Sequence, residues 1–194
     1  MDIPHTPALL EVYASAIEVF QMLAIFGSTV AISLGMQHKL VHHLTYSVTY
    51  YSNQSKLIGS VALRIVSQSI KCLHNMVNQG LMLNQGLCIN ADFGSAVIKA
   101  ICTCGGLVDG QDSLIIATSN LIKDLFYFLF RINTKPTDTV SVIGQQEQIE
   151  NDGGNEEIES HIFHQFTGIQ TQNRNDISYA KKMIQNVFIH PNNE

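Results

Sequence analysis

The stretch KLIGSVALRIVSQSIKCLHNMVN, residues 56–78, decides the fold, because its apolar side chains recur at helical spacing along its whole length. One side of the expected helix is apolar, and the other side carries polar and basic groups. The apolar side consists of Ile58, Val61, Ala62, Ile65, Ile70, Leu73, Met76 and Val77. A face of this width predicts a helix that buries one side against other helices, since no helix can bury such a face alone.

The sequence before this stretch predicts two further helical segments. Thr6 and Pro7 are suited to the start of a helix, with threonine as the cap and proline in the first turn. An apolar stripe follows, made of Leu9, Leu10, Tyr13, Ile17, Phe20 and Ala24, with Glu11, Ser15 and Glu18 on the other face. Residues 37–55 fit a helical stripe, but residues 44–51 also alternate like a strand. We expect a helix there because both flanks are helical, and an α+β fold with a strand near 44–51 is the alternative.

Two more helices are expected after residue 90. Asp92 is suited to capping a short helix over 93–104, and a longer apolar helix is expected over 114–132, interrupted only by Lys123 and Asp124. The sequence therefore predicts an all-α, bundle-like body of about five helices.

The composition divides the chain into three parts. Hydrophobic residues make up 45% of the chain but charged residues only 14%, against about 25% in an ordinary soluble domain. Most of the net charge of −5 lies after residue 130, where the chain has nine acidic residues and five basic ones. We expect an apolar helical body over 1–132, an acidic polar linker over 133–155, and two short amphipathic docking helices within 156–194. The acidic balance argues against a nucleic-acid partner.

Residues 19–36 form a stretch without charged side chains. The length of this stretch is at the lower limit for a membrane-spanning helix. Gly27, Ala31 and Gly35 stand four residues apart within it and are candidates for close helix packing. We expect a buried helix of a soluble bundle rather than a span. The first basic residue is Lys39, so no signal peptide is expected, and the four cysteines are expected to be thiols in the cytoplasm. Membrane association through 19–36 is the alternative.

No motif predicts an enzyme, a cofactor or a metal site. His38 and His42 share a helical face, but Lys39 stands where the metalloprotease motif needs glutamate. His161 and His164, with Glu157, form a second weak metal candidate that reads better as a surface cluster. The cysteines, Cys72, Cys88, Cys102 and Cys104, lack the Cys-x-x-Cys spacing of redox and zinc sites and are expected to pack in the core.

A body so poor in charge is expected to cover part of its surface with a partner. The predicted function is therefore that of a non-enzymatic interaction subunit: an adaptor, a chaperone-like protein or a structural component of a hetero-oligomeric assembly, for example a secretion-type complex. Its partners would be other protein subunits. The apolar helical residues expected to bind them are Leu121, Leu125, Phe126, Leu129, Phe130, Ile162, Phe163, Phe166, Ile184 and Phe188.

Overall fold

The computed structural model describes residues 6–25, 33, 38–58, 60–79, 92–103, 117, 118, 120, 121, 123, 124, 147–154 and 156. Four helices have full bounds: α1 (Pro7–Ile25), α3 (His38–Ile58), α4 (Ser60–Gln79) and α6 (Phe93–Thr103). This part of the chain contains no strand, which confirms the predicted all-α fold. The alternative with a strand near 44–51 is wrong, because α3 runs through these residues.

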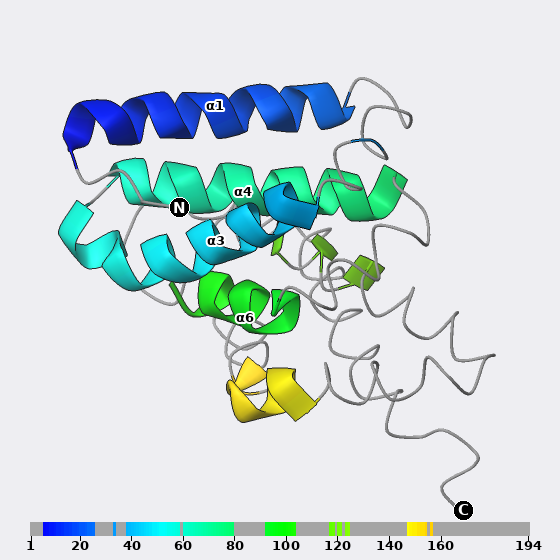
Figure 1. The fold of residues 1–194 in the computed structure, drawn as a ribbon. Helices are drawn as coiled ribbons and strands as arrows, with labels where there is room; N and C mark the ends of the chain where they lie inside the picture. Colours follow the sequence, from blue (N-terminus) through cyan, green and yellow to red (C-terminus); the bar gives the residue numbers. More distant parts are fainter. Residues whose placement is uncertain are drawn as a thin grey trace, which may run out of the picture.

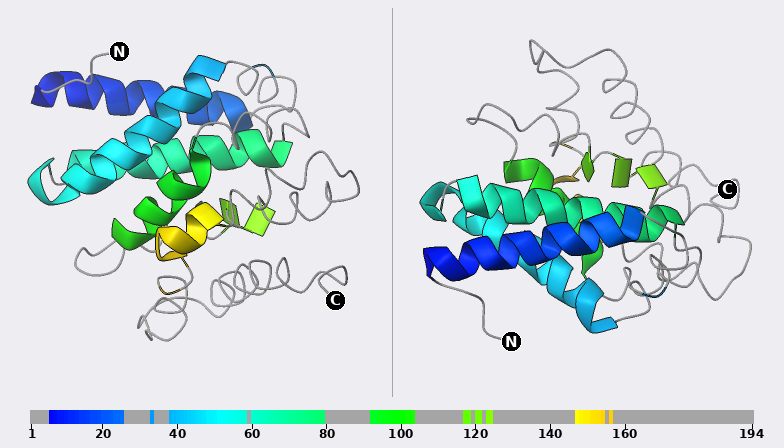
Figure 2. Two further views of the ribbon diagram at one scale, coloured as in Figure 1. Left: turned by 60° about the horizontal axis from the view of Figure 1, so that its bottom comes forward. Right: turned by 90° about the horizontal axis from the view of Figure 1, so that it is seen from above.

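Helix α4 packs against both α1 and α3, and α3 also packs against α6 (Figure 1). Figure 2 shows that α1 runs alongside α4, whereas α3 crosses them at an angle. Among the described elements α1 is therefore an outer helix, supported on its inner side.

The helix starts follow local chemistry. The amide of Leu10 donates to the carbonyl of Thr6 at 3.0 Å, so α1 begins where the Thr6-Pro7 pair predicts. The amide of Ala96 likewise donates to the carbonyl of Asp92 at 3.2 Å at the start of α6. Asp92 has a φ of +53°, a left-handed conformation that aspartate adopts more readily than most residues. The helix predicted from residue 56 is α4, but it begins at Ser60 because α3 continues to Ile58.

The core is built around α4, and it contains most of the apolar side predicted for that helix. Six of those residues, Ala62, Ile65, Ile70, Leu73, Met76 and Val77, are buried, and Val61 is packed against the core. The neighbouring helices add large side chains, among which Leu44, Tyr51, Phe93 and Ile98 are fully buried.

Residues 147–154 fall in the range 133–155 that the sequence predicts as a linker, and they pack against α6 (Figure 1). Ile149 is buried in the core. A Cβ at Gly154 would lie 2.6 Å from Cγ2 of Ile149 and 2.7 Å from Cδ1 of Ile98, so the contact has room only for glycine. The division into body, linker and docking helices stays a prediction, since most of 125–194 lies outside the described residues.

A cluster of tyrosines joins α1 to α3. The hydroxyl of Tyr13 lies 2.5 Å from Oγ of Ser47, which donates to the carbonyl of His43 at 2.6 Å. Because serine has one hydroxyl hydrogen, Tyr13 is the donor to Ser47. The ring of Tyr13 also lies 5.8 Å from that of His43, edge-on, and 6.2 Å from that of Tyr51. Burial lowers the pKa of His43, raises the pKa of Tyr13, and raises the pKa of Tyr51 to about 12.

These tyrosines predict a loss of stability at alkaline pH. A phenol whose pKa is raised by folding keeps its proton in the folded state after the unfolded state has lost it. The contribution of Tyr51 is thus complete below pH 10, its ordinary pKa, and is lost as the pH rises toward about 12. The slope from one such group reaches at most about 1.4 kcal/mol per pH unit. The thiol of Cys72, whose pKa burial raises to about 12, adds a loss of the same sign.

Urea unfolding followed by circular dichroism from neutral pH to about pH 11 measures this slope. Tyr51→Phe should make the alkaline slope shallower, whereas Tyr46→Phe, at a side chain that is 53% exposed, controls for the loss of a hydroxyl. An equal slope in the wild type and Tyr51→Phe would contradict the placement of Tyr51 in the core.

Candidate docking surface

Helix α1 is apolar on two opposite sides. Its inner side supplies Leu10, Ala14, Ile17 and Ala24 to the core. Of the seven large hydrophobic side chains that are exposed among the described residues, six lie on α1. These six are Leu9, Val12, Val19, Met22, Leu23 and Ile25, and the seventh is Tyr46 of α3. A concentration of exposed apolar side chains on one helix is typical of a binding surface.

A regular stripe runs along the middle of this exposed side. We call it the outer stripe, and it consists of Leu9, Val12, Ala16, Val19 and Leu23. The steps between its members are three, four, three and four residues, the spacing with which one helix packs along another. From Leu9 to Leu23 the stripe is about 21 Å long. All five side chains are exposed, with Val12 reaching 66%.

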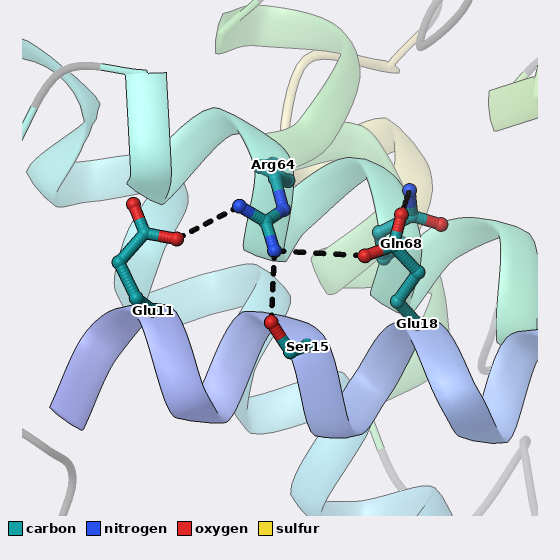
Figure 3. A network of polar contacts seen from close by, with 5 residues as sticks. All are labelled: Glu11, Ser15, Glu18, Arg64 and Gln68. Atoms are coloured by element: carbon teal, nitrogen blue, oxygen red, sulfur yellow. Dashed lines mark hydrogen bonds and ion pairs between the residues drawn. The ribbon is translucent and has the colours of Figure 1, made fainter. Parts of the chain in front are cut away.

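A polar network forms the edge of α1 that meets α4 (Figure 3). Arg64 of α4 donates from Nη1 to Oε2 of Glu11 at 2.8 Å and from Nη2 to Oγ of Ser15 at 3.1 Å. The same Nη2 lies 3.5 Å from Oε2 of Glu18, and Gln68 donates to the other oxygen of that carboxylate at 3.4 Å. Glu11 and Glu18 are the charged residues of α1, and both are held by α4.

The opposite edge of α1 is aromatic. Tyr13 bonds to Ser47 of α3, and both Tyr13 and Phe20 pack partly buried against the core. The outer stripe therefore lies between two anchored edges, which keeps it turned away from α4 and α3. This arrangement offers contact area and shape to another apolar helix. The five residues of the outer stripe carry no group suited to acid–base or nucleophilic chemistry.

None of the residues that the sequence predicts for partner binding belongs to α1. Leu121 is fully buried in the core, beside the buried Ala117 and Thr118 on the same segment. Leu125, Phe126, Leu129, Phe130, Ile162, Phe163, Phe166, Ile184 and Phe188 lie outside the described residues, as do Gly27, Ala31 and Gly35. The partner binding predicted for the first group and the close helix packing predicted for the three small residues stay predictions.

The charge of Asp124, which interrupts the apolar run over 114–132, has a partner that the sequence does not reveal. Its Oδ2 lies 2.8 Å from Nε2 of His74 on α4, and both side chains are largely shielded from solvent. Asp124 thus joins its segment to the central helix. A carboxylate beside an imidazole can also orient a general base.

Most of the candidate metal ligands lie outside the residues that the structure describes. His42 is exposed on α3, the side chain of His38 is not described, and His161 and His164 lie outside the described residues. Within the described part of the chain, no group of three histidine, cysteine, aspartate or glutamate residues is placed to hold a metal ion. Cys72 is a buried thiol and Cys102 an exposed one.

By length and composition, α1 is the described helix that could cross a membrane. The segment 19–36, for which a membrane span is the alternative to a buried helix, shares residues 19–25 with α1, and of 26–36 only Ser33 is described. No known protein family, curated protein or solved structure matches this chain. The use of the outer stripe is therefore inferred from its residues alone.

The Arg64 network predicts a small, salt-sensitive contribution to stability. Arg64, Glu11 and Glu18 have side chains that are 37%, 51% and 40% exposed, and ion pairs this open to water contribute about 1 kcal/mol or less. In a double-mutant cycle between Arg64→Met and Glu11→Gln, urea unfolding should give a coupling free energy of up to about 1 kcal/mol that falls as salt is added. A coupling that is unchanged or larger at high salt would contradict an ion pair between Arg64 and Glu11.

Proposed function

We propose that this protein is a non-enzymatic interaction subunit that binds an apolar helix of another protein molecule through the outer stripe of α1. The observation that carries the proposal is that, among the described residues, six of the seven large exposed hydrophobic side chains lie on this one helix. The proposal keeps the class expected from the sequence, an adaptor, chaperone-like or structural component of a cytoplasmic assembly.

The energetics favour a partner helix over permanent exposure to water. Fully burying a valine or leucine side chain contributes about 1.5–3 kcal/mol, and the large members of the stripe are roughly half exposed. Covering the stripe would thus contribute roughly 3–6 kcal/mol, which is comparable to the lower range of what association costs in lost freedom. The stripe alone supports a weak or transient complex, and a tight one needs further contacts.

The helical shape of the surface points to a helical occupant. Side chains at alternating steps of three and four residues leave grooves that the ridges of a second helix fill. A flat or extended partner would match this spacing less well. The segments 114–132 and 156–194 stay as predicted additional contacts.

A membrane is the second candidate, favoured by the length and apolar composition of α1. To enter a bilayer, α1 would have to leave α4, exposing Leu10, Ala14 and Ile17 and breaking the pairs between Arg64 and its two glutamates. A charged glutamate in the hydrocarbon region is costly. Carbonate extraction of native membranes separates the candidates, since an integral span stays in the pellet and a subunit of a soluble complex does not.

The test of the proposed function is to place a charge on the stripe. Val12→Glu should abolish stoichiometric co-purification of the native partner from detergent-free extracts, because the charge would be buried in the complex. Asn53→Glu, at an exposed polar position of α3, adds the same charge away from the stripe and should keep the partner. Both variants should unfold in urea as the wild type does. A Val12→Glu chain that keeps its full complement of partner would contradict the proposal.

A further inference from the structure

We propose that the occupant of the outer stripe is a second copy of this chain, bound through α1 in antiparallel orientation around a two-fold axis at Ala16. This rests on the proposed function, which requires only that the stripe bind a helix, and it names that helix.

The order of side chains in the stripe carries the inference. Read in either direction the stripe is leucine, valine, alanine, valine, leucine, with Ala16 at its centre. A two-fold contact joins the same patch on both subunits, so a residue on one side of the axis meets its mirror position. In an antiparallel pair Leu9 would face Leu23 of the partner subunit at the mirror position, seven residues from Ala16. Val12 lies four residues before Ala16 and Val19 three residues after it, so these two valines would meet with an offset of one residue, about 1.5 Å along the helix. Side chains of equal size would then meet in every layer.

Ala16 fits the axis. At the crossing point of two helices the backbones approach most closely, and a small residue there lets them do so. The size of the stripe side chains increases with distance from Ala16, first to valine and then to leucine. The distance between two crossing helices also increases away from the crossing point. A bulky residue at the centre would hold the ends of the stripe apart.

Charge does not oppose a copy of the same acidic chain as the occupant, because the stripe itself is neutral. Two molecules with a net charge of −5 repel each other unless the meeting surfaces are neutral. The charges of α1, Glu11 and Glu18, are held against α4 by Arg64, off the stripe. The residues that flank the stripe, Ala8, Tyr13, Ser15, Phe20 and Met22, carry no charge.

The same charges disfavour a lipid surface. Helices that lie on anionic membranes carry lysine or arginine on the face next to the headgroups. Helix α1 has no basic residue. Binding to vesicles is therefore an outcome of the test rather than the expectation.

The position of α1 gives a second molecule access. Among the described elements α1 lies at the outside of the body (Figures 1 and 2). The helix is 19 residues, about 28 Å, long. A contact along one such helix pair is smaller than the roughly 800 Å² per partner of a standard stable interface. We therefore expect a dimer that dissociates in the micromolar range.

Sedimentation equilibrium of the purified full-length chain over a range from about one to several hundred micromolar tests the dimer. The wild type should shift from 21.5 kDa to twice that mass as its concentration rises. Ala16→Glu should weaken the dimer at least tenfold, since it places two like charges at the axis. Val12→Glu should act in the same direction, and Asn53→Glu should leave the dissociation constant unchanged. Urea unfolding of each variant confirms that it is folded.

Cysteine cross-linking tests the orientation. Leu9→Cys mixed with Leu23→Cys should form a mixed disulfide faster than either variant forms one with itself, and the wild type shows what the native cysteines contribute. Faster cross-linking of Leu9→Cys with itself would show a parallel pair and overturn the antiparallel arrangement.

The following outcomes would contradict the dimer, the proposed function or both. A wild type that stays monomeric at every concentration overturns the dimer. An Ala16→Glu chain that dimerises like the wild type overturns dimerisation through the outer stripe. Flotation of the monomer with phosphatidylcholine vesicles, abolished by Val12→Glu, would assign the stripe to lipid instead. If the chain is monomeric but Val12→Glu still loses a native protein partner, the dimer fails while the proposed function stands. If neither a dimer nor a partner depends on Val12, both fail.

Discussion

The pairing of Arg64 with both carboxylates of α1 is the contact on which the orientation of this helix depends. Apolar residues occupy most of α1, and Leu9 and Val12 are as hydrophobic as Leu10 and Ile17. Hydrophobicity alone therefore does not determine which side faces the core. Glu11 and Glu18 break the symmetry, because only one rotation of α1 brings both to Arg64. The contribution of these half-exposed pairs to stability is small. Their effect is to select the rotation of α1 in which both carboxylates reach Arg64.

This rotation has a consequence for function. It places the small residues Ala14 and Ala24 on the inner side, where they let α1 lie close to its neighbours, and it leaves the outer stripe exposed. A monomer that leaves such a surface in water lacks the stabilising free energy of burying these side chains, which another rotation of α1 or a second helix could provide. The exposed stripe supports the proposal that it binds an occupant, and its symmetric order of side chains supports the proposal that this occupant is a second copy of the chain.

The sequence predicts the fold well where periodicity is strong. The apolar side of α4, the start of α1 at Thr6-Pro7 and the start of α6 after Asp92 follow from local patterns, and the structure confirms them. The surface was not predictable in the same way. Leu9 fits a stripe with Leu10 and Tyr13 in the sequence, yet it is 54% exposed. The contacts that decide this, such as Arg64 with Glu11 and His74 with Asp124, join residues 53 and 50 positions apart, and no local pattern encodes them.

The central claim, that α1 buries one apolar side and exposes the other, is tested most directly by methionine oxidation in the unmodified chain. Met22, beside the outer stripe, is 53% exposed, whereas Met76 is fully buried on α4. With dilute peroxide and mass spectrometry, Met22 should oxidise quickly and Met76 slowly in dilute protein. Met22 should then become protected as the concentration rises. Equal protection of both methionines in the dilute monomer would contradict the account.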